Sequence, residues 1–296
     1  MTALNQHRAI SHTDLQASSC SIRRLVSRPV TFPQRLAFVR EPRGQNASGL
    51  SLTHPDPFHI RAALSNGTPA AILDALGQLP TPSGGTLADD YAYQPPVSER
   101  WYPGPLFEHH RRVIEALHAY FDLPPGMDAQ LLDLTAAFHD PGKSNSIPRL
   151  EAGALRDAQK TYTLKMIDWW KPSLPLDGSA FNRMRAVITT NAHGSLFQGK
   201  LSVEAAANEI REGAQLAAMD PVAFLKLMTV FTQADIAAYT MPAGGPKHLD
   251  HVFELTADGQ FVPDEARGRL KYNPANEKLV ALLEASVRNF GKRKSP

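Results

Sequence analysis

A His-Asp pair at the end of an apolar helical pattern is the part of this chain best suited to chemistry. His139 and Asp140 stand at that point, His109 lies thirty residues before the pair, and Asp235 lies ninety-five residues after it. An imidazole and a carboxylate at the buried end of a helix are costly to desolvate unless they are paired or bound to a cation. A divalent metal ion would remove that cost, so we expect a metal site here.

The order His, His-Asp, Asp resembles the HD superfamily of metalloenzymes. His109, in a His-x-x-Arg-Val string, matches the first histidine of that family, the His139-Asp140 pair matches its doublet, and Asp235 matches its closing aspartate. The resemblance covers about residues 100 to 240 and implies an all-α HD-domain helical bundle that holds one or two divalent metals. Pro141 replaces the apolar residue usual after the doublet, which stiffens the turn.

The donor set indicates a class of metal but not one element. Two imidazoles and two carboxylates suit Mn, Mg, Fe, Co or Zn better than a metal selected by thiolates. His109 faces the same side as the apolar Val113 four residues later, whereas His110 shares a face with Leu106 and Leu117. His110 therefore remains a rival for the ligand role, and the match to the family motif favours His109.

Two further residues are candidates for catalysis beside Asp140. Lys143 ends the His-Asp-Pro-Gly-Lys string and could direct a positive charge towards a phosphate. His193 is a candidate second-metal ligand or proton donor to a leaving group. The plainer alternatives are a solvated surface lysine and a histidine that interacts with the dipole at a helix end.

The resemblance implies a metal-dependent phosphohydrolase acting on a small-molecule phosphate ester, with a nucleotide or cyclic nucleotide as the expected substrate. A second hypothesis is a non-hydrolytic HD enzyme, such as a di-iron oxygenase, a hydratase or a lyase. Such oxygenases use two extra histidines between the doublet and the last aspartate, where this chain has only His193. A third is a secreted effector or binding module with a regulatory site.

Helical periodicity predicts the elements that must carry these side chains. The expected helices begin near Pro105, Asp128, Arg149, Ser179, Ser202, Asp220 and Asn273. Gly194 is expected to stop the fourth of them, just after His193. Short helical segments are expected within residues 56–79, broken near Asn66-Gly67, and a small hairpin around Asp258-Gly259.

Composition and the family resemblance together divide the chain into a leader (residues 1–55), a short helix with a Pro/Gly-rich linker (56–100), the expected HD domain (101–290) and a frayed tail (291–296). Residues 1–53 contain seven arginines, no lysine and two acidic residues. Such a segment is typical of disorder, an organelle transit peptide or a type III-like secretion leader. We therefore expect a cytoplasmic protein or one delivered by its leader.

The remaining composition excludes several classes of protein. The single cysteine, Cys20, rules out an internal disulfide framework. No run approaches 18 apolar residues, so we expect no membrane span. The chain beyond the leader carries a slight excess of acidic residues and no basic, aromatic stripe, which argues against nucleic acid as a partner. The oligomeric state is left open by the sequence.

Overall fold

The computed structural model describes residues 57–82, 84–94, 105–121, 129–144, 158–239 and 246–289. These residues are mostly helical, which confirms the all-α class. The helices are α2 (Pro57–Asn66), α3 (Pro69–Gly77), α4 (Leu87–Tyr91), α5 (Leu106–Tyr120), α6 (Ala129–Phe138), α8 (Ala158–Trp170), α9 (Gly178–Thr189), α10 (Ala192–Phe197), α11 (Val203–Leu216), α12 (Pro221–Ala237) and α13 (Pro274–Asn289).

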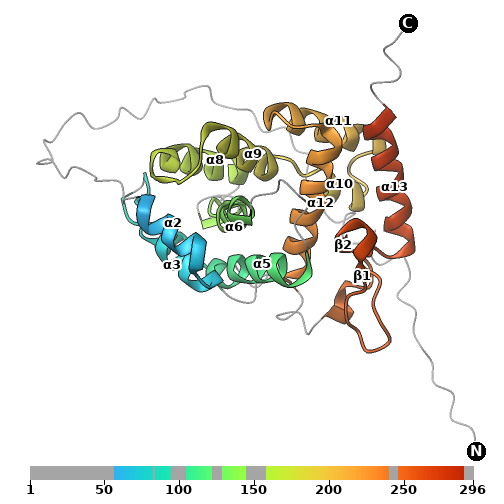
Figure 1. Ribbon diagram of the computed structural model, residues 1–296, viewed down its shortest axis with the longest axis horizontal. Coiled ribbons are helices and arrows are strands. Elements are labelled where there is room, and N and C mark those ends of the chain that lie inside the picture. Colours follow the sequence, from blue (N-terminus) through green and yellow to red (C-terminus); the bar gives the residue numbers. More distant parts are fainter. Residues whose placement is uncertain are drawn as a thin grey trace, which may run out of the picture. The chain divides into compact units, whose positions relative to one another are not determined.

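Helix α6 lies at the centre of the bundle, with α5 on one side of it and α8 and α9 on another (Figure 1). Every residue from Leu131 to Phe138 is buried, including Asp133. A helix that is apolar on all sides is stable only when neighbours cover it completely. The ring of Phe138 stacks on that of Trp170, with the ring centroids 5.2 Å apart. The His-Asp pair that follows Phe138 is therefore delivered into the interior.

Side-chain caps set several helix starts as the sequence predicts. Ser202 accepts a hydrogen bond from the backbone N–H of Ala205 at the start of α11. Asp220 accepts from the N–H groups of Val222 and Ala223 and so caps α12. These bonds satisfy backbone donors that have no partner inside the helix. The start of α12 is thus encoded locally, fifteen residues before Asp235 on the same helix.

The predicted end of the fourth helix is wrong. Helix α9 ends at Thr189, Thr190 adopts an extended conformation, and Gly194 lies inside a separate short helix, α10. A β-carbon on Gly194 would lie 2.6 Å from Oδ1 of Asn191. Gly194 thus lies within the first turn of α10 rather than terminating a helix, and His193 stands near the start of α10.

The segments around the bundle differ from the sequence expectation in detail. The linker contains helix α4 and a bridge between Pro80 and Thr86. In the expected hairpin, Leu255 pairs with Phe261 as one isolated bridge, while the two short strands β1 (Pro263–Asp264) and β2 (Arg269–Leu270) follow it. A strand of two residues depends on its packing, and β2 packs against α12.

Several predictions fall outside the described residues. They concern the leader, the aromatic end of the linker at 101–104, the cap at Asp128, the helix start at Arg149 and the tail at 291–296. Among the described helices, none taken singly is long and apolar enough to cross a membrane.

Candidate metal centre

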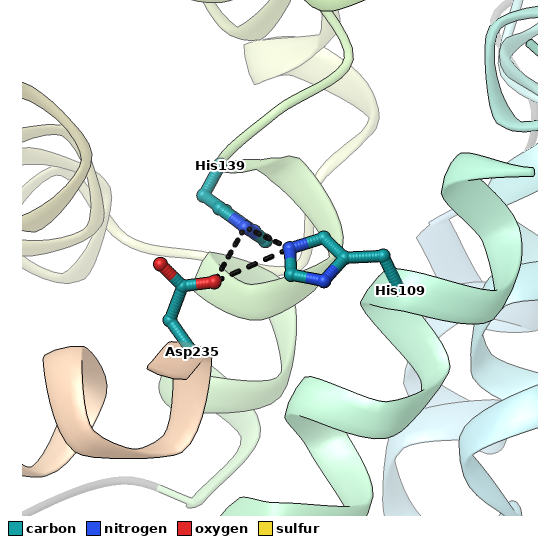
Figure 2. Close-up of side chains that lie close together, drawn as sticks. All are labelled: His109, His139 and Asp235. Atoms are coloured by element: carbon teal, nitrogen blue, oxygen red, sulfur yellow. Dashed lines mark hydrogen bonds and ion pairs between the residues drawn. The ribbon is translucent and has the colours of Figure 1, made fainter. Parts of the chain in front are cut away.

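Three helices bring the four predicted ligands together. His109 comes from α5, His139 and Asp140 from the turn after α6, and Asp235 from the last turns of α12. Figure 2 shows the two imidazoles and the Asp235 carboxylate pointing toward one another. The Nε2 atoms of His109 and His139 are 3.0 Å apart, and Oδ1 of Asp235 lies 3.2 Å and 3.5 Å from them.

Asp140 completes the group, which we call the His/Asp cluster (His109, His139, Asp140 and Asp235). Its Oδ2 lies 3.7 Å from Nε2 of His109 and 3.4 Å from Nε2 of His139. Metal–nitrogen and metal–oxygen bonds of about 2.1 Å place neighbouring ligand atoms about 3.0 Å apart in octahedral and about 3.4 Å apart in tetrahedral sites. The separations in the cluster match these spacings.

One donor atom of the His/Asp cluster, on Asp235, has no hydrogen bond of its own within the part of the chain that the structure describes. Oδ1 of Asp235 is buried and, among the described residues, has no aligned hydrogen bond, although both imidazoles are close. Buried polar atoms are nearly always satisfied by a hydrogen bond or an ion. The residues present therefore fit a divalent cation.

Electrostatics in the His/Asp cluster follow from burial and from the neighbouring charges. Burial would raise the pKa of the Asp235 carboxyl, but the His109 and His139 imidazoles outweigh it, so that pKa lies well below its usual value. Burial lowers the pKa of His139, yet the carboxylates of Asp140 and Asp235 bring it to about 9. Burial raises the pKa of Asp140. A proton on His139 thus holds the place that a bound cation would take.

Backbone and side-chain contacts orient the two residues of the doublet. Nδ1 of His139 donates to the carbonyl of Ala136 at 2.7 Å, so when the imidazole is neutral its lone pair is on Nε2, which faces the cluster. Gln159 Nε2 donates to Oδ1 of Asp140 at 2.7 Å. The N–H of Gly142 donates to Oγ1 of Thr163 at 3.1 Å. Helix α8 therefore fixes the turn that carries the ligands.

Gly142 has a steric role in that turn. A β-carbon there would lie 2.4 Å from the carbonyl oxygen of Gln159 and 2.7 Å from the backbone nitrogen of Thr163. Real β-carbons do not approach a backbone so closely, so a side chain at this position would displace the turn from α8. The glycine of the string is thus explained by close packing.

His110, the rival ligand, also lies beside the cluster. It is fully buried, neither ring nitrogen has a hydrogen bond among the described residues, and its ring centroid is 4.9 Å from that of His139. Donor atoms of His110, His139 and Asp140 form a second group that could hold a cation. Burial and the charges of His139 and His109 lower the pKa of His110 well below its usual value. His110 is therefore available as a neutral donor beside the cluster.

The two further catalytic candidates, Lys143 and His193, lie in different places relative to the cluster. The ammonium of Lys143 contacts Oδ2 of Asp140, so its charge lies at the edge of the cluster. Nε2 of His193 lies 3.2 Å from Oγ1 of Thr229, which precedes Asp235 by six residues, about 9 Å along α12. The groups of candidate ligands found among the described residues do not include His193. The structure thus brings Lys143 to the cluster and leaves His193 in another part of the core.

Sequence reasoning missed the residues that support the ligands. Gln159 holds Asp140, Tyr239 stacks on His109 with ring centroids 5.1 Å apart, and Tyr91 meets His110 edge-on at 5.2 Å. None of the three has a fixed spacing from a ligand in the sequence. A polar residue on an otherwise core-facing helix is a weak signal for Gln159, and no sequence signal identifies the two tyrosines.

Comparison with known proteins yields no relative. No protein-family model matches the chain, no curated protein matches it, and no solved structure matches it.

Proposed function

We propose that this chain is a metal-dependent hydrolase that cleaves a phosphate ester of a small molecule. The observation that carries the proposal is the convergence of two imidazoles and two carboxylates from three helices: the two Nε2 atoms are 3.0 Å apart, and each carboxylate has an oxygen 3.2–3.7 Å from both of them. This arrangement suits a divalent cation because the donors have lone pairs facing a common point. The order of these residues also resembles that of the HD superfamily.

Residues of the chain would take separate roles in binding the metal and in stabilising charge. His109, His139, Asp140 and Asp235 would hold the ion, and Gln159 keeps Asp140 oriented. A divalent ion at such a site polarises a P–O bond and lowers the pKa of a water molecule. Lys143, anchored on Asp140, adds a positive charge where a phosphate would gain negative charge during hydrolysis.

The substrate class follows from the proposal and from the lack of a basic, aromatic surface in the sequence. We expect phosphomonoesters or phosphodiesters of small molecules, and nucleotides and cyclic nucleotides are the first compounds to test. The ion should be one of the hard or borderline metals, with Mn, Mg, Fe, Co and Zn as the candidates.

The test combines metal analysis with activity. The full chain would be loaded with each candidate metal, its metal content measured by mass spectrometry, and hydrolysis followed on aryl phosphates, nucleotides and cyclic nucleotides. We expect at least one bound ion per chain. In the variant His139→Ala, kcat/KM should fall by more than about a hundredfold, because even supporting residues of a metal site contribute that much.

His118→Ala is the matched control. His118 is also on α5 and also pairs with a carboxylate, Asp133, at 2.8 Å, but its side chain is 48% exposed. We expect unchanged metal content and unchanged activity in this variant. A wild-type chain that binds metal and hydrolyses no phosphate ester would contradict the proposed function, and equal loss in the two variants would contradict the assignment of the site.

A further inference from the structure

A small pocket lies one helical turn beyond the His/Asp cluster, in the groove between α5 and α12. Its lining includes Arg112, Glu115 and Ala119 of α5 and Ala237 and Ala238 at the end of α12. Arg112 follows His109 by three residues and Ala238 follows Asp235 by three, so each lies about 4.5 Å further along its helix than a cluster ligand. The pocket and the cluster are therefore neighbours on the same pair of helices.

Arg112 is the arginine of this region whose charge is least matched. Its neighbour Arg111 donates two hydrogen bonds to Oε2 of Glu108, at 2.8 Å and 3.3 Å, and also pairs with Glu115. Nε of Arg112 lies 3.9 Å from the same Oε2 atom.

That distance is at the outer limit of an ion pair. The Nε atom of Arg112 is buried, and the described residues offer it no hydrogen bond. Arg112 lines the pocket, and Arg111 already pairs with both Glu108 and Glu115, so Arg112 brings a positive charge to the pocket wall.

The size of the pocket limits its occupant. Its volume is about 120 Å³, well below the roughly 300 Å³ or more of a pocket that encloses a whole drug-sized ligand. A group of a few heavy atoms fits, such as a phosphate or a carboxylate. Guanidinium groups match both of these oxyanions with paired hydrogen bonds.

We propose that this pocket, with Arg112 as its binding group, receives a second compact anionic group of the substrate, a phosphate or a carboxylate. A substrate would then have two anionic ends, one at the His/Asp cluster and one beside Arg112. The identification of this ligand as the substrate rests on the proposed function. The ability of the pocket to bind an oxyanion is independent of that function.

The experiment measures oxyanion binding without metal. The full chain would be treated with EDTA and titrated with inorganic phosphate by calorimetry. We expect the dissociation constant to rise at least tenfold in Arg112→Gln and to change less than twofold in Arg185→Gln. Arg185 is a matched control because it is a mid-helix arginine whose guanidinium pairs with Asp168 on the neighbouring helix, at 3.3 Å.

A second variant fills the pocket and keeps the charge. Ala119 lines the pocket and is exposed, so Ala119→Met adds volume there without disturbing the core. We expect it to weaken phosphate binding at least fivefold, with an unchanged circular dichroism spectrum. Absence of phosphate binding by the wild-type chain, equal effects of the two arginine variants, or unchanged binding in Ala119→Met would each overturn the inference.

Metal content, measured on the same proteins before EDTA treatment, separates this inference from the proposed function. If Arg112→Gln binds metal normally and keeps its phosphate affinity, the pocket inference fails and the metal centre stands. If the wild-type chain binds no metal but shows phosphate binding that depends on Arg112 and Ala119, the pocket stands as an oxyanion site and the hydrolase proposal fails.

Discussion

Two buried groups of charged residues in this bundle differ in the partners of their carboxylates. The His/Asp cluster joins α5, α6 and α12. The Arg269 network (Arg269, Asp264, Glu277 and Gln233) joins α12, α13 and the β1–β2 ribbon. In the network, Nη2 of Arg269 donates to Glu277 at 2.6 Å, and the Gln233 side chain makes two hydrogen bonds, of 2.7 Å and 2.9 Å, with the backbone of Leu270. Its acids thus have a permanent cation as partner.

The base in each group explains the difference. An arginine is always charged and offers donors only, so it neutralises its carboxylates directly. A histidine can present a lone pair, and in the His/Asp cluster the two Nε2 atoms and the carboxylates all face the same space. Burial and acid content are similar in the two groups. The type of base therefore distinguishes a cluster whose donors could hold a metal ion from a structural ion pair.

The strongest test of this comparison removes a carboxylate from the cluster. Asp140→Ala should lower metal affinity by at least about a hundredfold, because loss of a ligand should exceed the effect of losing a supporting residue. The fold should be largely retained, since Asp140 lies in a turn after α6. Metal content by mass spectrometry and a thermal melt would measure the two effects.

Asp264→Ala is the counterpart in the other group. It removes a carboxylate that lies 3.4 Å from Nε of Arg269. We expect unchanged metal content in this variant. Unchanged metal content in Asp140→Ala would contradict the assignment of the cluster.

The second prediction breaks the Arg269 network. Arg269→Met should lower the free energy of unfolding by about 3 kcal/mol, because it removes the buried cation and leaves the partly buried carboxylates with only the half-exposed Arg267. Metal content should not change. Arg267→Met is the control: Arg267 pairs with the same two acids, but its side chain is 51% exposed. We expect Arg267→Met to lower the free energy of unfolding by less than about 1 kcal/mol. Urea denaturation would measure both variants, and similar losses in the two would contradict the structural role given to Arg269.

The third prediction concerns pH and His193. Burial and the charge of Arg269 lower the pKa of this imidazole to about 4, against about 6.5 in an unfolded chain. A lowered pKa favours the neutral form in the folded state. Its stabilising effect is therefore complete above pH 6.5 and is lost as the pH falls towards 4. We expect His193 to account for about 2 kcal/mol of stability lost between pH 7 and pH 5.

Urea denaturation at the two pH values would measure this effect. His193→Gln should lose about 2 kcal/mol less than the wild-type chain over that interval. His251→Gln replaces an exposed imidazole and should follow the wild-type chain. A pH dependence that His193→Gln leaves unchanged would show that His193 is not buried as a neutral group.

The smallest expected effect is at Gln159. Gln159→Met removes the amide that donates to Oδ1 of Asp140 and keeps a similar volume. We expect a loss of about tenfold in metal affinity, the low end for a supporting residue, with little change in stability. Gln130→Met, which removes an exposed contact with Ser65, is the control. Equal metal affinities for both variants would mean that α8 does not orient the ligand.

Local rules in the sequence determined most of the elements. Capping by Ser202 and Asp220 sets the starts of α11 and α12, and the apolar run before His139 predicts a buried helix. These features depend on residues within a few positions of one another, so they can be read along the chain. The His139-Asp140 pair stands out in the same way, as an imidazole and a carboxylate in an apolar context, whereas His109 and Asp235 were assigned through the resemblance to the HD superfamily.

Tertiary structure alone decided which side chains meet. The approach of His109 to Asp235 and the placement of His193 beside Thr229 depend on how α5, α10 and α12 pack, whereas the contact between Lys143 and Asp140 joins residues three positions apart in one turn. Helical periodicity determines the face on which a residue lies, but not which neighbouring helix that face contacts. Gly194 was misinterpreted because a glycine does not by itself mark a helix end: α9 already ends at Thr189, and Gly194 lies inside α10.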